Sequence, residues 1–442
     1  MRLDVALSRL DQFSHAVIVT CDANGHPLNV ATRFSYDGDA LELQPVNAGT
    51  ALSGDARDAR ILVSSVRPRP GYGYDQRKYM EFAGTLETSQ PRWRFRPRAA
   101  RGWSEKDVPF IELCERALPQ ARRYLASLSR DRGIEVKPRM SLGWRFFLAT
   151  RLPFLTATLV PVALGIAVAG SEHHFALGLA LLTLLGGIAV HLGLNVANDV
   201  FDAMSGADEA NTTPTMFSGG SRVIQYGLVS LRQMALLCAA CYAIAIAVGL
   251  VLVAMTGAGL LWIGVAGILI SWFYTAPPLR LVHHGLGELA VALGFGPIMV
   301  LGAYYVQTQQ YSLKPFVLSI PVALLVMLIL YANEIPDRIS DAKAGKRTLV
   351  VRLSKPAVVR GYEVSAALAY IACIVGAATR VVPWTTLIAL LTVPLAVKTA
   401  RGLRDNYDQP YEVMPALQNN VILHFATGLL LVAGTLIGIA VG

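Results

Sequence analysis

Long apolar runs separated by short polar segments fill the chain from about residue 146 to its C-terminal end. Each run is close to the roughly 20 apolar residues that an α-helix needs to cross a bilayer. The pattern therefore predicts an all-α membrane domain of nine transmembrane helices. The expected spans are 152–170, 175–197, 233–255, 258–275, 287–307, 315–333, 361–379, 382–399 and 421–441.

The first part of the chain shows shorter segments in which apolar and polar residues alternate and which end at turn sequences such as Asp22-Ala-Asn-Gly25. Such alternation between Gly- and Asp-rich turns is typical of antiparallel strands. We expect a small β-barrel of five strands, followed by a helix over 105–129 that Ser104 caps. The strands are placed at 15–21, 27–34, 40–43, 60–66 and 79–86.

The pattern thus predicts a multi-domain protein. A soluble barrel domain with a helix is expected at 1–135, a linker or interfacial segment at 136–150, and the membrane domain at 151–442. The first residues, Met-Arg-Leu-Asp-Val-Ala, lack the apolar stretch of a secretory signal, so we expect the barrel domain to lie in the cytoplasm.

Composition supports the membrane interpretation. The chain has 442 residues, of which 54% are hydrophobic, and this excludes an ordinary soluble protein of the same length. The formal net charge of +9 fits the excess of basic residues that cytoplasmic loops carry, and we expect no nucleic-acid partner. With the barrel domain in the cytoplasm, the opposite side of the membrane receives only Lys314 and Arg380. The five cysteines include one CxxC pair, Cys238 and Cys241, but it lies within an apolar run and has no second Cys or His pair at metal-ligand spacing, so we expect packed side chains and neither a zinc site nor a disulfide framework.

The segment from Arg92 to Trp103 holds five arginines interleaved with two tryptophans and a phenylalanine. This composition can stack on and bind nucleic acid, and it also suits the headgroup zone of a bilayer. Because membrane spans follow about forty residues later, we favour contact with the membrane or with the second domain. A solvated edge of the barrel domain is the remaining alternative.

Two polar clusters follow long apolar runs, at the predicted ends of the second and sixth helices. The first holds Asn195, Asn198, Asp199, Asp202 and, further on, Asp208. Helical spacing places Asn195, Asn198 and Asp202 on one face.

The second cluster holds Asp337 and Asp341, an i, i+4 pair whose carboxylates can point to one place. Acidic residues at membrane depth are costly and indicate a functional site. Solvated helix ends are the alternative interpretation.

The chemistry of these clusters suits a divalent cation and a diphosphate. Carboxylate and amide oxygens are ligands that Mg²⁺ prefers, and basic side chains can neutralise the remaining phosphate charge. The nearby basic residues are Arg222, Lys343, Lys346 and Arg347, although basic side chains here can also be cytoplasmic anchors. An apolar helix bundle can bury the isoprenoid chain of a prenyl diphosphate. An ion-coupled transporter is the alternative of a different class, because transporters also use intramembrane acids.

The two clusters resemble the motifs of the UbiA superfamily of intramembrane prenyltransferases. Asn198, Asp199, Asp202 and Asp208 match its Asn-Asp-x-x-Asp motif and the aspartate downstream of it, and Asp337 and Asp341 match its Asp-x-x-x-Asp motif. The resemblance implies that these residues hold Mg²⁺, with Asp199, Asp202, Asp337 and Asp341 essential for catalysis.

The segment Tyr274-Thr-Ala-Pro-Pro-Leu-Arg280 resembles the loop that follows the family's fourth helix. The resemblance implies substrate contacts for Tyr274 and Arg280, and we add Asn195 because it lies one turn before Asp199. Pro278 stands where the family pattern has lysine. His191 and His424 lie within the spans and are expected to be packed, hydrogen-bonded side chains.

Three further segments, 219–230, 284–288 and 294–302, resemble the 1,4-dihydroxy-2-naphthoate branch of the superfamily. This branch implies transfer of a prenyl group to an aromatic acceptor with loss of its carboxylate, in menaquinone synthesis. Another quinone precursor or a glycerol-phosphate lipid remains an alternative acceptor, because Phe217-Ser218 stands where that branch more often has Gly-Pro.

The order of strands in the N-terminal domain resembles the FMN-binding split barrel of the pyridoxamine-phosphate oxidase-like group. The residues that carry the resemblance are the hairpin from His15 to Leu43, the segment from Leu52 to Val66 and the strand that begins at Tyr79. The resemblance implies FMN as a second cofactor. A flavin-free barrel that serves for docking or stability is the alternative.

Overall fold

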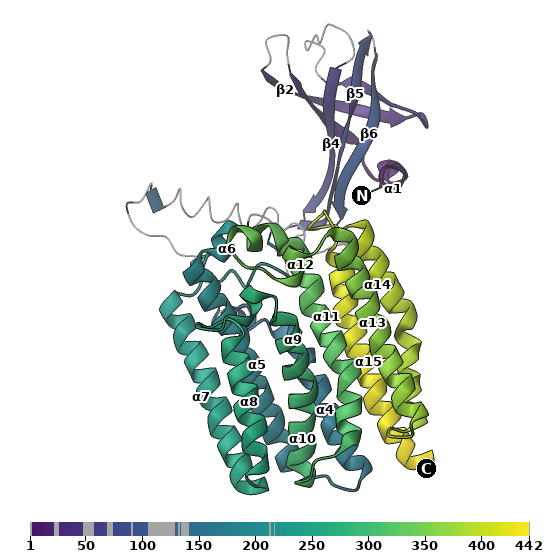
Figure 1. Ribbon diagram of the computed structural model, residues 1–442. Coiled ribbons are helices and arrows are strands. Elements are labelled where there is room, and N and C mark those ends of the chain that lie inside the picture. The colour runs from purple at the N-terminus through teal and green to yellow at the C-terminus, as the bar shows by residue number, and fades with distance from the viewer. Residues whose placement is uncertain are drawn as a thin grey trace. The chain divides into compact units, whose positions relative to one another are not determined.

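The computed structural model divides the chain into two compact units, Met1–Arg116 and Ala117–Gly442 (Figure 1). The structure describes residues 2–21, 26–46, 57–68, 74–89, 92–104, 129–130, 133, 141–211, 214–215 and 217–441. The predicted helix over 105–129 lies almost wholly outside these residues.

The first unit is a closed antiparallel barrel with the strand order β1-β2-β3-β6-β5-β4. The short helix α1 (Leu3–Leu7) and the turn η1 (Leu10–Gln12) precede it. The strands are β1 (His15–Cys21), β2 (Pro27–Tyr36), β3 (Leu41–Pro45), β4 (Arg57–Pro68), β5 (Tyr74–Ser89) and β6 (Arg92–Ser104). Alternate residues of β1 are buried, as the pleat of a strand with one covered face requires. The predicted barrel is confirmed, with one strand more than expected.

The additional strand is the arginine- and tryptophan-rich segment. Trp93 and Phe95 point into the barrel core, where 5% and 0% of their surface is exposed. Arg94 and Arg96 alternate with them on the outer face of the strand. Arg94 pairs with Asp37 at 2.9 Å, and Arg96 pairs with Glu87 at 3.2 Å. The prediction that these aromatic rings contact a membrane is therefore wrong for Trp93 and Phe95.

All nine predicted spans form helices in the second unit. In the part of the chain that the structure describes, eight helical segments are long and apolar enough to cross a membrane. They are η3–α4 (Leu152–Ser171), α5 (Leu177–Ser205), α7 (Leu231–Thr256), α9–η5–α10 (Gly287–Thr308), α11 (Leu313–Lys343), α13 (Lys355–Ala378), η6–α14 (Trp384–Asp405) and α15 (Met414–Val441). The ninth, α8 (Gly259–Phe273), has only 15 residues. Short helices α3 (Leu142–Ala149), α6 (Ala207–Ala210) and α12 (Leu349–Arg352) and the turn η4 (Leu281–His284) complete the unit.

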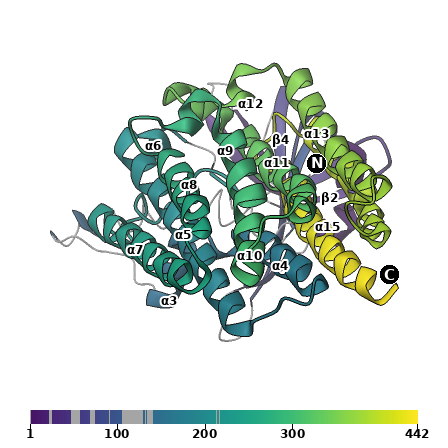
Figure 2. The same ribbon diagram turned by 60° about the horizontal axis from the view of Figure 1, so that its bottom comes forward.

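Two of these helices extend well beyond the predicted spans. α5 has 29 residues and α11 has 31, so each is longer than a bilayer core requires. α11 lies inside the bundle, with α9 and η5 packed on one side and α13 and α15 on another (Figure 2). The extra turns of α5 and α11 carry both acidic clusters beyond the apolar part of the bundle.

Candidate active site

The first acidic cluster occupies the last turns of α5. Asp199 and Asp202 are buried there, with 2% and 5% of their surface exposed. Asn198 donates a hydrogen bond from Nδ2 to Asp202 Oδ2 at 3.1 Å, and the backbone N–H of Ser221 donates to both carboxylate oxygens of Asp199 at 3.2–3.3 Å. The helix ends at Gly206, whose φ of 74° is left-handed.

The second cluster occupies the last turns of α11. Asp337 accepts hydrogen bonds from Asn211 Nδ2 at 2.8 Å and from the backbone N–H of Gly219 at 2.7 Å. Both donors belong to the segment that follows α5 and α6, so this segment ties the end of one acidic helix to the end of the other.

Lys346 joins the two clusters directly. Its Nζ lies 2.6 Å from Asp202 Oδ1 and 3.9 Å from Asp341 Oδ1, and only 6% of the residue is exposed. Burial alone lowers the pKa of Lys346, but the carboxylates of Asp202 and Asp341 outweigh this and raise it above its usual range. The lysine is therefore a fixed positive charge between two acidic helices.

Asp208, in α6, faces the same region. Gln225 Nε2 donates to its Oδ2 at 3.1 Å. Burial raises the pKa of Asp208 to about 8, and the nearby carboxylates of Asp202 and Asp199 add to the effect. Gly220, with a φ of 74°, lies between the acids, because a Cβ there would be 2.8 Å from Asp208 Oδ1 and 3.3 Å from Asp199 Oδ1.

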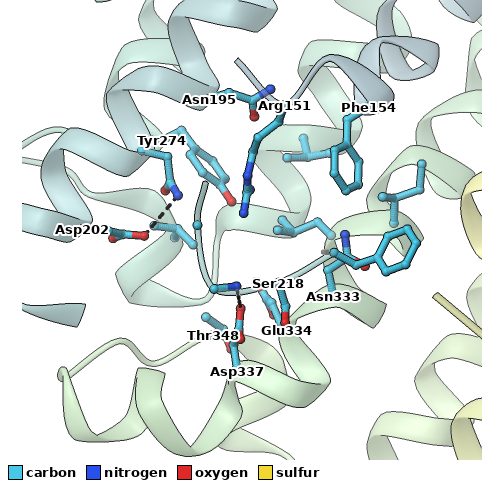
Figure 3. A pocket seen from close by; sticks show the side chains of 18 of the residues that line it. Arg151, Phe154, Asn195, Asp202, Ser218, Tyr274, Asn333, Glu334, Asp337 and Thr348 are labelled. Atoms are coloured by element: carbon cyan, nitrogen blue, oxygen red, sulfur yellow. Dashed lines mark hydrogen bonds between the residues drawn. The ribbon is translucent and has the colours of Figure 1, made fainter. Parts of the chain in front are cut away.

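A polar cavity of about 170 Å³ opens between these elements (Figure 3). It brings together eight of the residues that the sequence predicted, namely Asn195, Asn198, Asp202, Asp208, Tyr274, Asp337, Asp341 and Lys346. A larger, mostly apolar cavity of about 430 Å³ runs beside it among α5, α7, α8 and α10. The two share the lining residues Leu194, Tyr274, Val291 and Phe295, so a polar compartment adjoins an apolar one.

A model of the UbiA prenyltransferase family matches residues 158–421. The chain belongs to the UbiA prenyltransferase family. It is therefore a prenyltransferase and an integral membrane protein, and the ion-coupled transporter is no longer an alternative.

Two relatives of this prenyltransferase illustrate the branch that it resembles. It is 30% identical over 315 residues to the 1,4-dihydroxy-2-naphthoate octaprenyltransferase of Bacillus subtilis, covering 70% of this chain and 97% of that protein. It is 30% identical over 292 residues to the 2-carboxy-1,4-naphthoquinone phytyltransferase of Synechocystis, covering 65% and 91%.

Solved UbiA homologues have similar backbones at low identity. The structure from Archaeoglobus fulgidus bound to GPP and Mg²⁺ gives a TM-score of 0.48 at 15% identity, covering 65% of this chain and 99% of that one. The apo structure from Aeropyrum pernix K1 gives 0.49 at 18% identity, covering 62% and 97%.

The remaining predicted residues of the prenyltransferase do not line the polar cavity. Asp199 lies behind the Gly220 turn. Arg222 is buried and donates to the backbone carbonyls of Asp208 and Asn211, so it braces the segment after α5. Three basic residues are exposed at the surface, namely Arg280, Lys343 and Arg347.

Arg151 lines the cavity and was missed in the sequence. It precedes η3 with a left-handed φ of 53°, and its side chain points toward Asp337 in Figure 3. Asn195 Nδ2 donates to the carbonyl of the preceding residue, Thr150, at 3.3 Å, which fixes this turn. A lone arginine beside Pro153, at the edge of the first apolar run, was the only signal in the sequence.

The two intramembrane histidines are packed as predicted. His191 is 3% exposed, shares a hydrogen bond of 2.8 Å with Thr158 Oγ1 and packs edge-on against Phe295. His424 is 1% exposed and lies 3.2 Å from the carbonyl of Thr156.

Proposed function

We propose that this enzyme transfers a prenyl group from a polyprenyl diphosphate to 1,4-dihydroxy-2-naphthoate. The observation that carries the proposal is the polar cavity, where Lys346 joins the acids of α5 and α11 beside an apolar compartment. Such a pair of compartments suits a substrate with a charged head and a long apolar chain. The names of the relatives from Bacillus subtilis and Synechocystis support a naphthalene-ring acceptor.

The side chains of the cavity fit Mg²⁺. Among the described residues, no three His, Cys, Asp or Glu side chains converge closely enough to hold a metal ion alone. Mg²⁺ is commonly held by one or two carboxylates together with substrate phosphates and water, and the hard oxygen donors here suit that arrangement. The proposed ligands that line the cavity are Asn198, Asp202 and Asp208 on one side and Asp337 and Asp341 on the other. Asp199, which the sequence also predicted as a ligand, lies outside this cavity and accepts from the backbone N–H of Ser221 with both oxygens. When bound, Mg²⁺ supplies positive charge that stabilises the leaving diphosphate.

The residues of the chain have separate tasks in this proposal. Lys346 and Arg151 provide fixed positive charge next to the departing diphosphate, which takes the electrons of the broken C–O bond. The apolar compartment binds the isoprenoid chain and keeps water from the allylic cation. Lys343 and Arg347, which are exposed and lie within three residues of Lys346 in the chain, are proposed to attract the diphosphate.

We further propose that the site faces the cytoplasm. The support is the distribution of basic residues, which leaves Lys314 and Arg380 at the opposite end of the bundle. Lys314 lies 3.5 Å from Glu172 at that end, where α4 stops and α11 begins.

FMN binding by the N-terminal barrel stays a prediction. The closed six-stranded barrel is compatible with the resemblance to split barrels. Flavin absorbance of the purified full-length protein, or its retention of added FMN, would support it, and a colourless protein that does not retain FMN would contradict it.

The proposed reaction is tested with the full chain in lipid nanodiscs, supplied with Mg²⁺, a labelled prenyl diphosphate and 1,4-dihydroxy-2-naphthoate. We expect a prenylated, decarboxylated product that disappears in Asp202→Asn and Asp337→Asn. Asp405→Asn is the matched control, because Asp405 is exposed at the end of α14. Transfer only to a different quinone precursor or to a glycerol phosphate would reject the naphthoate, and wild-type rates in both variants would reject the metal site.

A further inference from the structure

Two buried glutamates lie beside the acidic clusters and belong to neither motif. Glu334 in α11 is 5% exposed, and Glu288 in the first turn of α9 is 2% exposed. Their carboxyl groups face each other, and the hydroxyl of Thr348 lies next to Glu334. Two segments distant in sequence thus bring two carboxyl groups together inside the bundle.

The two glutamates differ in their hydrogen bonds. Glu288 Oε1 accepts from the backbone N–H of Leu349 at 3.1 Å, so this side chain is anchored to the start of α12. Glu288 Oε2 and both oxygens of Glu334 receive no hydrogen bond from any residue that the structure describes, so only Glu334 is without an anchor on either oxygen. Unpaired polar atoms inside a protein are costly, and their retention indicates a task.

The aspartates of the motifs have other partners. Asp337 accepts from Asn211 and Gly219, Asp202 from Asn198, and Lys346 forms ion pairs with Asp202 and Asp341. These aspartates are also proposed ligands of Mg²⁺, and a carboxylate bound to Mg²⁺ is a poor proton acceptor. Unlike Asp202 and Asp341, Glu334 forms no ion pair with Lys346.

Glu334 lines the polar cavity, one helical turn before Asp337 (Figure 3). It thus lies nearer than Asp337 to the apolar core of α11. Val291 and Phe295 line both compartments and offer apolar surface that an aromatic ring could contact. Glu334 therefore borders the cavity that is proposed to hold the reacting groups.

We propose that Glu334 takes the hydroxyl proton of the aromatic acceptor, and that Glu288 is the positioning residue behind it. The proposal rests on the proposed function. A buried carboxylate oxygen that receives no hydrogen bond accepts a proton more readily than one that donors already hold. Glu334 carries such oxygens and borders the cavity.

The step balances without an additional reactant. The acceptor O–H bond breaks and its proton goes to Glu334, while the ring carbon that carries the carboxylate forms the C–C bond to the allylic carbon and diphosphate leaves with the C–O electrons. The carboxylate then leaves as CO₂, and its bonding electrons restore the aromatic ring as an oxyanion. Glu334 returns the proton to that oxygen, so the pair ends in its starting state.

The test compares Glu334→Gln with the wild type in nanodiscs, using 1,4-dihydroxy-2-naphthoate and a ring-fluorinated analogue whose hydroxyl is more acidic. We expect kcat with the parent acceptor to fall by about 10²–10⁴-fold, the usual contribution of a general base, with KM for the prenyl diphosphate unchanged. The analogue, normalised to its wild-type rate, should recover part of the loss. Glu172→Gln is the matched control, because Glu172 accepts a hydrogen bond from Tyr304 at 2.6 Å at the opposite end of the bundle.

The outcomes separate the two proposals. If the wild type does not prenylate the naphthoate, the proposed function fails and this inference falls with it. If the wild type does so and folded Glu334→Gln retains its kcat, or if both acceptors lose rate equally, only the base assignment is overturned. If Glu334→Gln does not fold, Glu334→Asp decides: a stronger preference for the fluorinated acceptor supports the proposal, and an unchanged preference rejects it.

Discussion

At the scale of single residues, the site depends on one buried lysine. Lys346 neutralises part of the negative charge of Asp202 in α5 and Asp341 in α11, and this allows the two carboxylates to lie in one buried site. Removing one partner of a buried ion pair leaves uncompensated charge, which is strongly destabilising.

We therefore expect Lys346→Met to lower kcat/KM by about 10²–10³-fold, as the loss of a fixed charge at a developing anion commonly does. The measurement is the initial rate of prenyl transfer at saturating Mg²⁺. Lys398→Met is the control, because Lys398 in α14 is exposed and does not line the cavity. Equal losses in both variants would contradict a specific role for Lys346.

Gly220 allows a second residue-scale prediction. Gly220→Ala would place a methyl group against the Asp208 and Asp199 carboxylates and strain a left-handed turn. Gly227→Ala is the control. Gly227 also has a left-handed φ, of 67°, but a Cβ there meets nothing within 4 Å, so this variant adds backbone strain without a contact to the acids. Both variants should lose about 1 kcal/mol of stability through strain, seen as lower unfolding temperatures. Only Gly220→Ala should also lose Mg²⁺-dependent activity.

At the scale of the elements, α7 and α8 wall the compartment proposed for the isoprenoid chain. Gly249 in α7 lines this cavity and has no neighbour within 4 Å of its Cβ position. Gly249→Leu should therefore occupy part of the cavity without a clash.

Because each buried methylene contributes about 0.8 kcal/mol, we expect Gly249→Leu to raise the kcat/KM ratio of short over long prenyl diphosphates by tenfold or more. The ratio is measured with donors of two chain lengths. Gly170→Leu in α4 is the control, since its Cβ position is also open but does not line the cavity. An unchanged ratio would place the isoprenoid elsewhere.

The spacing of Asp337 and Asp341 already placed both on one helical face, and apolar runs of about 20 residues located the helices. Contacts between distant segments could not be predicted in this way. Lys346 meets Asp202 across 144 positions, and only the packed bundle sets that distance. The alternation of Arg and aromatic residues in β6 was a strand signal, but its strong charge favoured a surface interpretation.

At the scale of the whole molecule, the proposed orientation determines which residues reagents can reach from outside the cell. Arg380 is exposed at the turn after α13, and Cys21 is exposed in the barrel. In intact cells, a membrane-impermeant maleimide should label Arg380→Cys but leave Cys21 unmodified until the membrane is opened. Labelling of Cys21 in intact cells, with Arg380→Cys left unmodified, would contradict the proposed orientation. The wild-type chain is the control for reaction at Cys21 and the other native cysteines.

The short helix α8 has a consequence for the lipid around the enzyme. Its 15 residues rise only about 22 Å, against roughly 30 Å for a bilayer core. Trp262 near one end is 75% exposed, and such a ring is typical of the water interface, while Trp272 near the other end packs edge-on against Phe201 and Tyr242. We therefore expect the membrane to thin beside α8, and we expect the rate of prenyl transfer to depend on the acyl-chain length of the surrounding lipid. Such local thinning would shorten the distance that the charged head of a lipid-dissolved substrate must travel from the leaflet to the site.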